Sequence, residues 1–374
     1  MTAAPPAAAK RRPIAVGERP VPPVKWWAAF GAVLLAFQAF VLGRWITGPY
    51  FKSVDPGPTP MPGWMKGALT FWQIVLPIAG LIVLYWFVVR PWRRERRIGL
   101  DGLMVIAFLT LSFHDPLSAY VGHWYTYNAW QVNMGSWLNS VPGALAPGIP
   151  DHQVAYPLLI VPGAYVVVFL LVTMMGAAIM RRAQARWPGI PRVGLAAICF
   201  AVMVPFDLIF EGVIFMPMGS WEYPGGHVKI FADTYHAYPV NEALTTGAIF
   251  TMFACIKYFT NDRGQSLAER GAEQLGGGAV KVTATRMLAV IGLVTLAMTI
   301  GYTLPNTWFG AHSTAWNTDI QKRSYLTYTC GEGPGVACPG PDVPLLRNDN
   351  RDRGANGPAF GRNYPPQVAY DRGQ

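Results

Sequence analysis

Residues 154–180 read VAYPLLIVPGAYVVVFLLVTMMGAAIM and contain no charged side chain. An α-helix needs about 20 mostly apolar residues to cross the hydrocarbon core of a bilayer, so this stretch predicts a transmembrane helix. Similar stretches recur along the chain, and we expect about seven membrane-spanning helices. Their approximate bounds are 27–47, 68–90, 99–122, 154–180, 193–217, 240–260 and 285–305.

The third of these stretches is the least regular. Asp101 lies near its start, and His114-Asp115-Pro116 interrupts its second half, where proline removes a backbone donor. A six-span arrangement therefore stays open.

The composition agrees with an all-α, polytopic membrane protein. Of the 374 residues, 52% are hydrophobic and only 13% are charged, whereas about 25% of residues are charged in ordinary soluble domains. The net charge of +10 comes from short basic clusters between the apolar stretches and not from one continuous basic face, so no nucleic acid partner is expected.

The basic clusters predict the orientation of the chain, because cytoplasmic loops of membrane proteins are enriched in lysine and arginine. They occupy the N-terminal tail and the second, fourth and sixth loops, with members Lys10, Arg11, Arg12, Arg90, Arg93, Arg94, Arg96, Arg97, Arg181, Arg182, Arg186, Arg192, Lys257, Arg263, Arg270 and Lys281. By contrast, residues 123–152 contain no lysine or arginine, and residues 219–239 contain only Lys229. We therefore expect a multi-pass protein of the bacterial cytoplasmic (inner) membrane, surrounded by lipid, with a cytoplasmic N-terminus and an extracytoplasmic C-terminal tail.

The two ends of the chain differ from the helical bundle, which we place at residues 27–305. Residues 1–26 are rich in alanine and proline and predict a disordered cytoplasmic tail. A secretory signal peptide would also begin with basic residues, but the long basic region and the span-length apolar stretch after it favour an uncleaved first helix. Residues 306–374 predict a loop-rich extracytoplasmic tail.

The C-terminal tail contains two cysteines that bracket a segment rich in glycine and proline, Cys330 and Cys338. Disulfides persist in oxidising compartments, so we expect these two residues to form one. Two unpaired thiols are the alternative, and the spacing does not match a zinc site.

Four carboxylates in or beside the predicted spans are the candidate catalytic residues. Asp207 and Glu211 lie four residues apart, which places both on one face of an α-helix. Glu242, preceded by Asn241, opens the sixth span, and Asp115 lies toward the outer end of the third. Ionisable groups inside membranes usually face the bundle interior, and neighbouring carboxylates can divide acid and base roles. Alternatively, the carboxylates pair with donors and stabilise the bundle, and Asn241 caps its helix.

The outer loops are rich in aromatic residues, some of which belong to the aromatic belt of a membrane interface. The others are mixed with histidine, asparagine and glutamate, which suits a pocket for a bulky, mostly apolar molecule with a few oxygens. The predicted pocket residues are His114, Tyr127, Asn128, Glu222, Tyr223, His236 and Asn241. The histidines lack the HxxxH spacing of membrane di-iron enzymes, and no phosphate-binding loop is present, so we expect no metal and no cofactor.

The order of several motifs resembles the AveC-like spirocyclase family of actinobacterial membrane proteins, over about residues 27–345. The motifs are His114-Asp115-Pro116, the aromatic loop after it, Asp207 with Glu211, Trp221-Glu222-Tyr223-Pro224-Gly225, Tyr238-Pro239-Val240-Asn241-Glu242 and Asn306-Thr307-Trp308-Phe309. The resemblance implies formation of a spiroketal from a dihydroxy-ketone polyketide, or dehydration, although the substrate does not follow from the family.

Spiroketal formation needs an acid, a base and a pocket that fixes the geometry of attack. We expect Asp207 and Glu211 to be the acid/base pair, supported by Asp115 and Glu242. The second hypothesis is a non-catalytic membrane subunit that binds or passes a lipid-like molecule and docks a partner protein through its outer loops and the polar tail after Ala311. Truncation of the tail distinguishes the two, because only a docking subunit would require it.

Overall fold

The computed structural model describes residues 21–119, 124–143 and 153–328, together with the cysteines at 330 and 338. Most of the predicted disordered N-terminal tail and of the C-terminal tail lies outside the described residues. The long helices are α1 (Pro23–Ile46), α2 (Gly63–Leu84), α4 (Leu100–Leu111), α5 (Val161–Arg186), α6 (Arg192–Asp207), α7 (Val240–Tyr258) and α8 (Ala279–Met298). The shorter ones are α3 (Arg90–Glu95), α9 (Leu304–Ala311), α10 (Thr318–Gln321) and α11 (Ser324–Thr327).

Six helical stretches of the described chain are long and apolar enough to cross a membrane. They are Pro23–Ile46, Gly63–Glu95, Leu100–Ala119, Val161–Arg186, Arg192–Met218 and Ala279–Ala311. The remaining predicted span, near 240–260, forms α7, which packs against α5 and α6 within the bundle. It is less apolar than the other six because it contains Asn241, Glu242, Lys257 and three threonines. The predicted all-α membrane bundle is thus confirmed.

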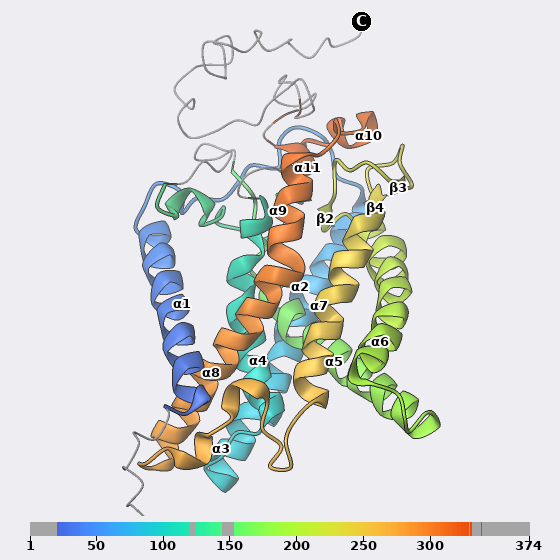
Figure 1. Ribbon diagram of the computed structural model, residues 1–374. Helices are drawn as coiled ribbons and strands as arrows, with labels where there is room; N and C mark the ends of the chain where they lie inside the picture. Colours follow the sequence, from blue (N-terminus) through green and yellow to red (C-terminus); the bar gives the residue numbers. More distant parts are fainter. Residues whose placement is uncertain (1–20, 120–123, 144–152, 329, 331–337, 339–374) are drawn as a thin grey trace, which may run out of the picture.

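The two ends of the bundle differ in chemistry (Figure 1). One end carries α3 and the connections from α5 to α6 and from α7 to α8, where the basic clusters lie. The other end carries four short strands, β1 (Thr126–Tyr127), β2 (Trp221–Glu222), β3 (Lys229–Ile230) and β4 (Tyr238–Pro239), together with α10 and α11. β1 pairs antiparallel with β2, and β3 pairs antiparallel with β4. The basic loops predicted to share one side of the membrane therefore share one end of the bundle.

Three of the spans contain a π-helical segment, in which the helix is wider than an α-helix. These segments are η1 (Tyr85–Val89), η5 (Leu208–Phe215) and η9 (Thr299–Thr303). Each is followed two residues later by a proline, Pro91, Pro217 or Pro305. Proline cannot donate to the carbonyl four residues before it, and its ring clashes with that carbonyl, so a widened turn before the proline relieves the conflict.

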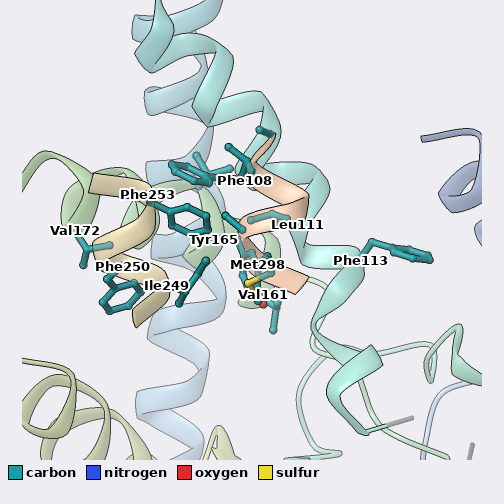
Figure 2. Close-up of a cluster of buried hydrophobic side chains, with 14 of the residues drawn as sticks. Phe108, Leu111, Phe113, Val161, Tyr165, Val172, Ile249, Phe250, Phe253 and Met298 are labelled. Carbon is teal, nitrogen blue, oxygen red and sulfur yellow. The ribbon is translucent and has the colours of Figure 1, made fainter. Parts of the chain in front are cut away.

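Aromatic side chains from several helices form the centre of the bundle (Figure 2). Phe108 of α4 and Phe253 of α7 have ring centroids 5.0 Å apart, and Phe169 of α5 lies 5.5 Å from Phe253. Ile249 and Met298 extend this packing into α7 and α8. The core thereby fixes the positions of the helices that carry the polar residues.

The predicted disulfide between Cys330 and Cys338 is present. Both cysteines pack in one buried cluster with Met65 and Leu69 of α2 and with Tyr325 of α11. The disulfide therefore lies in the segment after α11 and packs against the loop-rich end of α2.

Candidate functional site

A cavity of about 140 Å³ lies inside the bundle, below the strands of the loop-rich end. A single water molecule needs only about 10–15 Å³ of such space, so the cavity has room for a ligand. The wall is mostly apolar and aromatic, but it also contains the carboxylates of Asp115, Asp207, Glu211 and Glu242. The four candidate carboxylates, which come from two spans and α7, therefore meet at one cavity.

Asp207 and Glu211 are both held by donors from the outer loops. The Tyr238 hydroxyl donates to Oδ2 of Asp207 at 2.6 Å. The Trp221 indole and the Tyr223 hydroxyl both donate to Oε1 of Glu211, each at 2.6 Å. Asp207 is the last residue of α6 and Glu211 lies within η5, so the π-helical segment sets the offset between the two carboxylates.

The two bonds to Glu211 follow from the geometry of a short strand. Successive side chains of a strand point to opposite faces, so Trp221 and Tyr223 share a face while Glu222 points the other way. The backbone of β2 is held by its pairing with β1, where Thr126 lies opposite Glu222. Loop residues thereby reach a carboxylate inside the bundle.

Glu242, near the start of α7, is fully buried, and both of its carboxylate oxygens accept hydrogen bonds. Oε2 accepts from the Trp124 indole at 2.9 Å and from the Asn306 amide at 3.1 Å. Oε1 accepts from the Thr246 hydroxyl at 3.0 Å. These donors come from the first aromatic loop, from α9 and from α7 itself, so Glu242 connects three parts of the protein.

Asp115 occupies the helical break after α4, between the short turns Ser112–His114 and Pro116–Ala119. The hydroxyl of Tyr165, on α5, donates to its Oδ1 at 2.7 Å. Its other oxygen, Oδ2, is buried and has no hydrogen-bond partner among the described residues. Asp115 therefore has a buried carboxylate oxygen that no donor among the described residues satisfies.

No lysine or arginine from the described part of the chain lines the cavity. The ion pairs of the described residues lie elsewhere and are Lys257–Asp101, Arg263–Glu273, Arg286–Glu269 and Arg323–Asp319. Carboxylates that share a low-dielectric site without a cation repel one another when ionised, so protons are shared among them. Such a cluster can both donate and accept protons.

Two of the seven predicted pocket residues, Tyr127 and Tyr223, line the cavity. The other five lie outside its wall: His114, Asn128, Glu222, His236 and Asn241.

Asn128 has a structural role instead, since its amide donates to the Gly219 carbonyl at 2.8 Å and its Oδ1 accepts from the Trp130 backbone at 3.0 Å. Glu222 is fully buried and points to the opposite face of β2 from Trp221 and Tyr223, the two donors to Glu211. Burial in this loop raises the pKa of Glu222 well above its ordinary value. His114 is also buried, and its Nδ1 has no hydrogen-bond partner among the described residues.

Several lining residues were not predicted. The lining side chains beyond those already placed are Tyr125, Ile160, Val161, Ala164, Tyr165, Val168, Phe169, Phe210, Trp221, Thr246, Ile249, Phe250, Met298 and Tyr302. Two of them, Tyr165 and Tyr302, place a tyrosine hydroxyl within an otherwise apolar span, which is a signal in the sequence that could have identified them.

The fold and the cavity define an α-helical membrane protein with a buried cluster of carboxylates and aromatic donors at its loop-rich end. A family model described as Spirocyclase AveC-like matches residues 95–326, which is more than half of the chain, and the protein therefore belongs to this family. The match includes all four carboxylates. No protein with a curated description and no solved structure matches the chain.

Proposed function

We propose that this protein is a membrane-embedded acid/base enzyme that cyclises or dehydrates a hydrophobic, oxygenated compound of the polyketide or lipid type. The observation that carries the proposal is the meeting of four carboxylates at one cavity that no basic side chain of the described residues lines. Membership of the spirocyclase family supports the same reaction class.

The hydrogen bonds favour different roles for Asp207 and Glu211. Hydrogen bonds donated to a carboxylate stabilise its ionised form. Glu211 accepts two such bonds on one oxygen, whereas Asp207 accepts one from Tyr238. We assign Asp207 as the acid and Glu211 as the base.

In the proposed cyclisation, Asp207 protonates the hydroxyl of a hemiketal, the carbon–oxygen bond breaks, and water leaves. The resulting oxocarbenium ion is attacked by a second hydroxyl of the substrate, and Glu211 accepts the proton of that hydroxyl. Trp221 and Tyr223 line the cavity, and their aromatic rings would stabilise the positive charge of the intermediate. In a dehydration, Glu211 would instead accept a proton from carbon.

The other two carboxylates would support the pair. Asp115, with one unpartnered oxygen, would exchange protons with the cluster, and Glu242, with donors to both oxygens, would fix the position of α7 against the aromatic loop. Glu242 is thus a positioning residue in this proposal.

The test compares lipid-soluble metabolites, by mass spectrometry, from cells that make the wild-type protein, Asp207→Asn, Glu211→Gln or the double variant. The matched control is Glu273→Gln, which removes an exposed carboxylate at the basic end of the bundle. We expect the three site variants, and not the control, to accumulate a compound that differs from the wild-type product by one molecule of water.

Equal metabolite profiles at equal protein levels in the membrane would exclude the proposed enzymatic function. The protein would then be better described as a subunit that binds or passes a lipid-like molecule and docks a partner protein. In that case, truncation after Leu346 should abolish the partner's function, whereas an enzyme should tolerate it.

A further inference from the structure

The cavity is closed toward the loops and toward the bundle centre, but not toward one side. The lining tyrosines of the loop-rich end are buried, with exposed fractions of 3% for Tyr125, 4% for Tyr127 and 3% for Tyr223. The lining residues of α7 and α8 are buried as well, including Phe250 at 3% and Met298 at 1%. Access past these tyrosines or past α7 and α8 is therefore blocked by packed side chains.

Six lining residues are partly exposed, and four of them lie on α5 and on the π-helical segment of the fifth span: Ala164, Val168, Phe169 and Phe210, besides Trp221 of β2 and Tyr302 of η9. Ala164 and Val168 of α5 and Phe210 of η5 are half-buried, although all three line the cavity. Ala164, Val168 and Leu171 are spaced four and three residues apart, so they share one face of α5. Leu171 is 56% exposed. This face continues from the cavity wall to the outer surface of the bundle.

α5 and η5, which both contribute to the cavity wall, pack mainly against other elements. α5 packs against α2, α4, α6 and α7, whereas the main contacts of η5 are with α6 and with the short turn Met216–Met218. The outer surface of η5 is apolar, with Ile209 54% and Val213 48% exposed. An apolar surface on a membrane-spanning segment faces lipid.

A row of aromatic rings runs along α6 and η5 to Trp221 of β2, and Trp72 of α2 packs on it, 5.1 Å from Phe215. Phe206 stacks on Phe210 with centroids 5.3 Å apart, Phe210 lies 4.6 Å from Phe215, and Phe215 stacks on Trp221 at 6.1 Å. Phe210 is the member of this row that both lines the cavity and directly precedes Glu211. A rotation of one ring would therefore change access to the carboxylates.

We propose that the cavity opens sideways into the bilayer between α5 and η5, and that Phe210 is the side chain that closes the opening. The substrate is then an amphiphile dissolved in the membrane, which enters with its oxygenated part toward Glu211 and leaves its apolar part between the helices. This inference rests on the proposed function. It adds that the substrate is dissolved in the bilayer, and it adds the route by which the substrate reaches the carboxylates.

The test uses the full-length protein in phospholipid vesicles and a photoreactive probe, a long-chain hydroxy-ketone that carries a diazirine near its oxygenated end. After illumination, mass spectrometry maps the labelled peptides. In the wild-type protein we expect labels on the segment that contains Asp207 and Glu211. Ala164→Trp and Val168→Trp fill the proposed opening and should each reduce this labelling several-fold, whereas Phe210→Ala should increase it.

The matched control is Ile209→Trp, which adds the same bulk to the lipid-facing side of η5 and should leave the labelling unchanged. Gel filtration shows which variants fold. If Ala164→Trp does not fold, the opposite effects expected for Val168→Trp and Phe210→Ala still decide the question. Unchanged labelling in folded Ala164→Trp and Val168→Trp would overturn the lateral opening. Because the readout is occupancy and not turnover, Asp207→Asn and Glu211→Gln should still be labelled even if the proposed chemistry is wrong.

Discussion

The hydroxyl of Tyr238 donates a 2.6 Å hydrogen bond to Oδ2 of Asp207, and both side chains are buried. Tyr238 belongs to strand β4 at the loop-rich end, and Asp207 is the last residue of α6. A residue of the proposed acid/base pair is therefore positioned by a loop as well as by its own helix.

Tyr238→Phe removes only the hydroxyl of this pair. Leaving a buried acceptor without its donor costs about 1–3 kcal/mol, so we expect a lower melting temperature in detergent and a lower rate of product formation. Tyr85→Phe is the matched control, because the Tyr85 side chain is 47% exposed on the outside of the bundle. A Tyr238→Phe variant with wild-type stability and product formation would show that the bond is not needed.

Gly212→Ala tests the same contact from the helix side. A Cβ atom at position 212 would lie 3.0 Å from Cγ of the Tyr238 ring, so the ring would have to shift by a few tenths of an ångström, and we expect this shift to disturb its hydrogen bond to Asp207. We expect Gly212→Ala to lower product formation about as much as Tyr238→Phe, and the double variant to show little further loss, because both changes disrupt one interaction. At Gly67 on α2 a Cβ would meet no atom within 4 Å, so Gly67→Ala is the control. Fully additive losses would contradict a shared cause.

Glu222 gives a prediction for the pH dependence of stability. Burial raises the pKa of this loop carboxyl well above its ordinary value, an effect that the neighbouring Arg323 only partly opposes. A raised pKa means that the folded state retains the proton longer than the unfolded state. The stabilising contribution of the protonated Glu222 side chain is therefore complete below about pH 4.3, where an unfolded glutamate titrates. It is lost as pH rises toward the folded-state pKa.

Glu222→Gln keeps the shape of the protonated carboxyl and removes its titration. The stability of the variant relative to the wild-type protein should accordingly rise with pH above about 4.3, by up to about 1.4 kcal/mol for each pH unit. Melting temperatures of both proteins across a pH series would measure this. A constant difference between the two curves would mean that Glu222 is not held as the neutral acid.

The disulfide predicts sensitivity to reductant at the loop-rich end. Closing a loop this short is worth about 2–3 kcal/mol in the chain-entropy account, and Cys330 and Cys338 are eight residues apart. We expect reductant, or Cys330→Ser with Cys338→Ser, to lower the melting temperature. Thiol labelling of the intact protein should modify these two residues only after reduction, while full labelling without reductant would show that the bond does not form.

Sequence reasoning identified the membrane bundle because uninterrupted apolar stretches and alternating basic loops are strong signals. The four carboxylates that meet at the cavity could also be identified, since charged side chains are rare in membrane spans. Sequence reasoning could not reveal the π-helical segments. Asp207 and Glu211 were placed on one face by the spacing of an α-helix, whereas Glu211 lies within the π-helical segment η5, which begins directly after Asp207.

The loop residues were harder to predict, because a two-residue strand gives too little sequence to show its alternation. Trp221 and Tyr223 point to Glu211, and Glu222 does not, yet all three were equally plausible from composition. Asn128 was chosen for its polar side chain, but polar side chains in loops often bind nearby backbone groups, as this one does.

The lack of any basic side chain from the described residues in the cavity wall has a consequence for how the catalytic cycle would close. In a cyclisation with loss of water, the proton given to the departing hydroxyl equals the proton taken from the attacking one. The charge of the cluster would therefore be the same before and after each turnover, with only the position of the proton changed. Asp207 and Glu211 would then need an exchange of one proton within the cluster, which a path through Asp115 could provide, and the site would require no supply of protons across the membrane.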